Sequence, residues 1–209
     1  MANTVDDALQ YNNGALTAVW SQLSGATVPS SPRDDLVWAY VAIAIGHHQA
    51  IHSLVTQHLI ASASALLRSQ IETFFRGLWV NAVATEEQVN AIRGGSDKPF
   101  PVFRQMAEDL DAFYGADGWL RGFVDHWATL NGYTHSGLEQ LGRQFRDDNT
   151  LGPNYPDELV MELVVTSGTV SIGCIVPIFR AMGLNDKAVV FEEWLAEHPF
   201  YEKVDTPTS

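Results

Sequence analysis

The chain contains 209 residues, of which 46% are hydrophobic and 18% are charged, and its formal net charge at pH 7 is -13. This composition excludes a largely disordered chain, and the acidic balance argues against broad contact with phosphate backbones, so no binding to DNA is expected. The length predicts one domain over residues 1–198, followed by a tail at residues 199–209. The first residues carry neither a basic region nor an apolar stretch, so no signal peptide is visible and a cytoplasmic protein is expected.

Helix signals recur along the chain, and strand signals do not. Thr4 and Asp7 have the spacing of a capping box, and Ser31 directly before Pro32 predicts an N-cap followed by proline at the first helical position. A break is expected near residues 58–62, because one helix across that region would be improbably long for a compact domain. The pattern predicts an all-α bundle of about seven or eight helices. The predicted helices cover about residues 4–23, 32–57, 61–83, 85–93, 101–114, 117–146 and 157–182, with a last helix capped by Asn185.

Two long stretches, residues 36–67 and residues 163–179, contain no Asp, Glu, Lys or Arg. The first holds four histidines, and the second holds several serines, threonines and glycines, so neither is apolar enough for a typical membrane span. Both stretches therefore predict buried helices. The single cysteine, Cys174, lies in the second stretch, where apolar surroundings should make its thiol inert, and it excludes an internal disulfide and a multi-cysteine zinc site.

Three charged residues, Arg68, Glu72 and Arg76, follow the first uncharged stretch at helical spacing. The i, i+4, i+8 pattern places them along one stripe of a helix, where Glu72 before Arg76 is the favourable order for an ion pair. Bulky apolar neighbours predict that the row is partly buried, and buried charges need further partners. The row can be a structural network, a ligand or active site, or an ordinary surface ladder.

A second candidate site lies around His135, one helical turn beyond Asn131. Small residues on this face would let another helix approach, so we expect His135 to be at least half buried. A half-buried imidazole near an amide can act as a general acid or base, but it can equally be a hydrogen-bonded core residue. Gly132 and Gly137 each weaken a helix, which indicates close packing, a break or a site.

A third candidate is the pair His48 and His52, which have the i, i+4 spacing of two metal ligands. A third ligand would have to come from elsewhere, such as Asp125, His126 or His135. Both histidines straddle an apolar face, so core or interface positions are favoured over a metal site. No metal and no cofactor are expected.

Residues 64–79 and residues 130–137 together resemble a group of bacterial all-helical domains of unknown function that are HEPN-like. The resemblance spans about residues 33–146 and implies a helical bundle, often dimeric. Many HEPN proteins are metal-independent ribonucleases whose motif is an arginine, a polar residue, three further residues and a histidine. Asn131 and His135 match this motif, but Leu130 stands at the arginine position. The resemblance therefore implies either a lost activity or a cation supplied by another residue, namely Arg68, Arg76 or Arg143.

These observations predict a cytoplasmic, HEPN-like, non-catalytic binding or interaction module, expected to be a homodimer that takes RNA or a small ligand. One alternative is a metal-independent ribonuclease of toxin or phage-defence type, with His135 as acid and base and an arginine on the phosphate. The other is a metal-dependent helical-bundle enzyme that uses His48 and His52. Neither a membrane nor DNA is expected as a partner. The candidate catalytic residues are His135, Asn131, Arg68, Glu72 and Arg76, and the candidate ligand-binding residues are Tyr133, His48 and His52.

Overall fold

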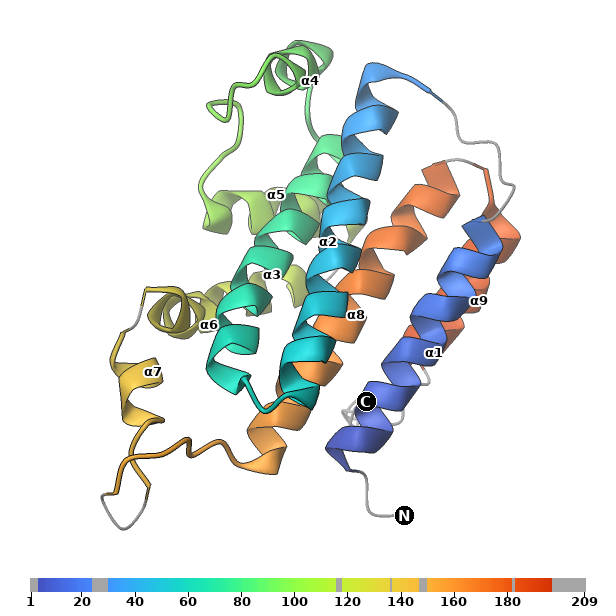
Figure 1. The fold of residues 1–209 in the computed structure, drawn as a ribbon. Helices are drawn as coiled ribbons and strands as arrows, with labels where there is room; N and C mark the ends of the chain where they lie inside the picture. The colour runs from blue at the N-terminus through green and yellow to red at the C-terminus, as the bar shows by residue number, and fades with distance from the viewer. Residues whose placement is uncertain are drawn as a thin grey trace, which may run out of the picture.

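A computed structural model describes residues 4–23, 30–115, 118–135, 137–146, 150–181 and 183–196. Within these ranges the chain forms nine helices and no strand, which confirms the all-α prediction (Figure 1). The predicted tail at residues 199–209 lies outside the described residues. The helices are α1 (Val5–Leu23), α2 (Pro32–Thr56), α3 (Ile60–Ala82), α4 (Glu86–Arg93), α5 (Phe103–Tyr114), α6 (Trp119–Thr134), α7 (Leu138–Gly142), α8 (Asp157–Ala181) and α9 (Asn185–Ala196).

Local capping sets the helix starts, as the sequence predicts. The Thr4 hydroxyl accepts a hydrogen bond from the Asp7 amide at 3.1 Å, and the Asp7 carboxylate accepts one from the Thr4 amide at 2.9 Å. The Ser31 hydroxyl accepts the Asp34 amide at 3.1 Å, directly before Pro32. These bonds satisfy amide groups that have no partner inside the helix, so α1 and α2 begin where predicted.

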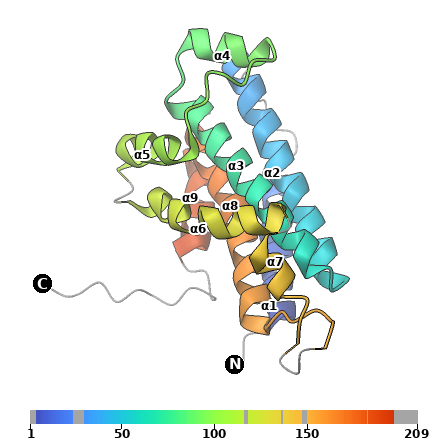
Figure 2. The same ribbon diagram turned by 90° about the vertical axis from the view of Figure 1, so that its left-hand side faces the viewer.

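Three long helices, α2, α3 and α8, run side by side through the bundle, with α1 and α9 on the far side of α8 (Figure 1). The chain reverses between α2 and α3 at His58, whose φ of 59° lies in the left-handed region, so the predicted break is confirmed. Helix α6 crosses the long helices at a steep angle, as Figure 2 shows. This crossing brings α6 against α3 and positions the site described below.

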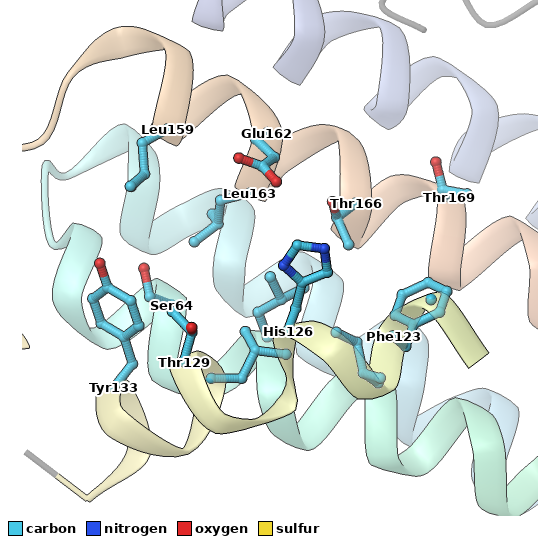
Figure 3. A pocket seen from close by; sticks show the side chains of 14 residues that line it. Ser64, Phe123, His126, Thr129, Tyr133, Leu159, Glu162, Leu163, Thr166 and Thr169 are labelled. Carbon is cyan, nitrogen blue, oxygen red and sulfur yellow. The ribbon is translucent and has the colours of Figure 1, made fainter. Parts of the chain in front are cut away.

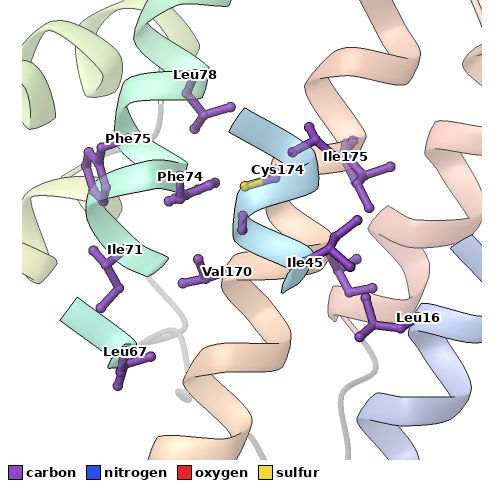
Figure 4. Close-up of a cluster of buried hydrophobic side chains, with 14 of the residues drawn as sticks. Leu16, Ile45, Leu67, Ile71, Phe74, Phe75, Leu78, Val170, Cys174 and Ile175 are labelled. Atoms are coloured by element: carbon purple, nitrogen blue, oxygen red, sulfur yellow. The ribbon is translucent and has the colours of Figure 1, made fainter. Parts of the chain in front are cut away.

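The core is built from apolar side chains of α2, α3 and α8, such as Ile45, Phe74 and Ile175 (Figure 4). Helix α8 is long and apolar enough to cross a membrane, but 67% of its most apolar window is buried, as in the core helix of a soluble protein. This confirms the prediction of a buried helix. Burial raises the pKa of Cys174 on this helix, so its thiol is held in the unreactive protonated form, also as predicted.

The prediction of a single helix over residues 117–146 is wrong, because α6 ends at Thr134 and a separate helix, α7, follows. His135 caps α6 by donating its backbone amide to the Asn131 carbonyl at 3.0 Å. The Gly137 amide then bonds back to the Gly132 carbonyl at 2.6 Å. Leaving a helix costs less free energy at glycine than at other residues, so Gly132 and Gly137 favour the break.

Candidate functional site

The Arg68, Glu72 and Arg76 row forms as the sequence predicts. One carboxylate oxygen of Glu72 accepts a hydrogen bond from Arg68 Nη1 at 3.1 Å, and the other accepts one from Arg76 Nη2 at 2.7 Å. The exposed fractions of the three side chains are 22%, 29% and 33%. The row is therefore partly buried, and it is not an ordinary surface ladder.

The two arginines of this row also bind neighbouring elements. Arg68 Nε donates to Asn131 Oδ1 on α6 at 2.5 Å, and its guanidinium group lies 4.6 Å from the centre of the Trp127 ring. The Arg76 guanidinium group lies 4.7 Å from the centre of the Phe100 ring in the segment before α5. Charged hydrogen bonds and cation–π contacts of this kind hold α3 against α6 and against the segment before α5.

His135 does not join this network. Its side chain is exposed, so the prediction that it is at least half buried is wrong. The reason is the break after Thr134, which takes the following residue off the face of α6 that packs on the bundle. Asn131 lies within the helix and meets Arg68, whereas Tyr133 is buried and faces in a different direction, into a pocket.

A pocket of about 430 Å³ lies between α3, α6 and α8 (Figure 3). The pocket lies next to the arginine row on α3. Leu67 lines the pocket, and the following residue, Arg68, binds α6. Most of the wall is apolar, and polar side chains occur at one end and at the exposed rim that His126 and Glu162 form, which we call the mouth. The lining residues are Ser64, Leu67, Ile71, Gly122, Phe123, His126, Thr129, Leu130, Tyr133, Leu159, Glu162, Leu163, Thr166 and Thr169.

Two sets of polar groups line the pocket, in addition to Thr166 and Thr169. The hydroxyls of Ser64, Thr129 and Tyr133 gather at one end, while the imidazole of His126 and the carboxylate of Glu162 point toward each other from α6 and α8 (Figure 3). Ser64 is only 3% exposed, and its hydroxyl has no hydrogen-bond partner among the described residues. Burying a hydroxyl without a partner costs about 1–3 kcal/mol, so this group indicates a partner supplied from outside the chain.

His48 is part of the core rather than of this pocket. Its Nδ1 lies 2.8 Å from the Ser167 hydroxyl, which donates its own proton to Gln70 Oε1 at 2.7 Å. The proton of the imidazole must therefore sit on Nδ1, which leaves Nε2 buried without a partner in the described structure. Burial, and then the neighbouring His52, lower the pKa of His48 to about 4. Of the alternatives that the sequence left open, His48 is therefore a core residue.

The described part of the chain contains no group of three or more His, Cys, Asp or Glu side chains that could hold a metal ion. His48 already uses one ring nitrogen on Ser167, and His126 and His135 are exposed. His48 and His52 therefore gain no third ligand from the residues that the structure describes.

Most residues that line the pocket were not predicted from the sequence as ligand-binding residues. Glu162 and Thr166 stand four residues apart in α8, and this spacing would have placed them on one face. Nothing in the sequence shows that this face meets Ser64 on α3 and His126 on α6, because that contact depends on how the helices cross.

The model of a family of unknown function, DUF6988, matches residues 41–190, which include α3, α6 and α8. No curated protein and no solved structure matches the chain. The resemblance to HEPN proteins stays a prediction, since the family description says nothing of such a relationship.

Proposed function

The chain belongs to the DUF6988 family of unknown function, and we propose that it is a non-catalytic binding protein whose pocket between α3, α6 and α8 holds a small, largely apolar molecule. The observation that carries this proposal is the pocket itself. Its volume of about 430 Å³ is within the usual range for small-molecule sites, and its walls combine apolar side chains with a few polar groups.

The arginine row supports this role by positioning the pocket wall. Arg68 ties α3 to α6 through Asn131, close to Leu130 and Tyr133, which line the pocket. In this view Arg68, Glu72 and Arg76 are positioning residues, and none of them touches the ligand.

A metal-independent ribonuclease is the alternative, and the contact between Arg68 and Asn131 favours it, because it places a cation beside the polar residue of the HEPN-like motif. Two features favour binding instead. The Arg68 guanidinium group already bonds Asn131 and Glu72, and a net charge of -13 repels a polyanion. The homodimer and the cytoplasmic location stay predictions.

A dye titration tests the proposal. The neutral dye N-phenylnaphthylamine should bind the purified protein saturably, with the rise in fluorescence that marks an apolar site. Thr166→Phe and Gly122→Leu add bulk at the pocket, and each should weaken dye binding about tenfold or more. Gly122 has no heavy atom within 4 Å of the position of an added Cβ, so its variant should fold.

The matched control is Thr17→Phe, which makes the same change at an exposed position of α1. It should bind the dye like the unmodified protein. Absence of saturable binding, or equal binding by the pocket variants and the control, would overturn the proposal.

A further inference from the structure

We infer that the ligand of this pocket is an organic cation, with an apolar body inside, an amine at the mouth held by Glu162, and an uncharged hydrogen-bonding group at the inner end. This inference rests on the proposed function, because it specifies the ligand class for the same pocket. Nothing in the family match assigns a ligand.

The charges that line the pocket disfavour an anionic head group. The lining contains no lysine and no arginine, and its one carboxylate belongs to Glu162. A fatty acid or an organic phosphate would therefore meet a like charge at the mouth, in a protein whose net charge is already -13. A protonated amine would meet an opposite charge instead.

The placement of Glu162 suits such a head group. Its side chain is exposed on α8, and it forms no ion pair with the described residues. The next residue, Leu163, is buried and lines the pocket, so an apolar body against Leu163 lies next to the carboxylate. Figure 3 shows the Glu162 side chain across from His126, and both side chains are exposed.

The inner end of the pocket requires a different kind of group. Ser64 is buried with a hydroxyl that lacks a partner in the described structure, and the Tyr133 hydroxyl lies nearby (Figure 3). A wholly apolar ligand would leave the Ser64 hydroxyl unsatisfied, at the cost already described. A ligand hydroxyl, ether or carbonyl at this depth would pair with it.

Displacement of the bound dye by molecules of matched length tests the charge at the mouth. Decylamine should bind about three- to fivefold tighter than decanol, as expected for an ion pair at a partly exposed site, and decanoate should bind more weakly than decanol. Added salt should reduce the preference for the amine. Glu162→Gln should abolish this preference.

A matched variant serves as the control for this assignment. Glu158→Gln makes the same change at an exposed residue one turn earlier on α8, outside the pocket lining, and it should keep the preference for the amine. Loss of the preference in Glu158→Gln would overturn the assignment to Glu162.

A second comparison tests the inner end. A ten-carbon amine with a hydroxyl at its far end should gain at least twofold over decylamine in the presence of Ser64, and this gain should vanish in Ser64→Ala. Equal binding of amine, alcohol and carboxylate would overturn the inference about charge while leaving the proposed pocket intact. If the dye itself does not bind, the proposed function fails first.

Discussion

Replacing Gly168 with alanine should destabilise the protein strongly, although alanine is the better helix former. Gly168 lies in α8 opposite Asn12 of α1, and a Cβ at this position would fall 2.6 Å from Asn12 Nδ2. The Asn12 amide cannot easily move away, because it is 1% exposed and donates to the Val164 carbonyl at 2.9 Å.

The magnitude follows from three terms. Alanine gains about 1 kcal/mol of helix propensity over glycine. Overpacking a core contact costs about 1–3 kcal/mol, and displacing a buried amide from its acceptor costs about 1–3 kcal/mol more. The net loss in the free energy of unfolding should therefore be about 3 kcal/mol for Gly168→Ala.

Urea unfolding, followed by circular dichroism, measures this loss. The matched control is Gly46→Ala, at an exposed position of α2 where an added Cβ meets no heavy atom within 4 Å, and it should gain up to about 1 kcal/mol. In an Asn12→Ala background, most of the cost of Gly168→Ala should disappear, because the clashing side chain is gone. A Gly168→Ala protein as stable as the unmodified one would refute the reasoning.

Two further predictions concern the histidines. The neutral form of His48 is favoured in the fold, where its pKa is about 4, so the unfolded chain takes up the proton first as the pH falls through the window from 6.5 to 4. His48 should thus remove about 2 kcal/mol of stability between pH 7 and pH 5, and His48→Gln should show a correspondingly smaller loss in urea unfolding. An unchanged pH dependence in that variant would contradict the buried, neutral imidazole. In EDTA, mixed single-stranded RNAs should stay intact with both the unmodified protein and His135→Ala, because Leu130 stands at the motif arginine position and the Arg68 guanidinium group is already bonded to Asn131 and Glu72. Cleavage that vanishes in His135→Ala would instead favour the ribonuclease, with Arg68 as the next residue to change.

The helical class and the starts of most helices could be predicted from the sequence. The pairs Thr4 with Asp7 and Ser31 with Asp34 act within one turn, so their hydrogen bonds can be predicted without knowing the fold. The ion pairs of Glu72 are equally local, since i, i+4 neighbours meet on any helix.

Features that depend on how the helices cross could not be predicted from the sequence. The break after Thr134, which exposes His135, was one of several outcomes that the neighbouring glycines allowed. Ser64, His126 and Glu162 are far apart in the chain, and they line one pocket only because α6 lies across α3 and faces α8. Side-chain spacing along a helix defines its faces, but which faces meet depends on packing over the whole bundle.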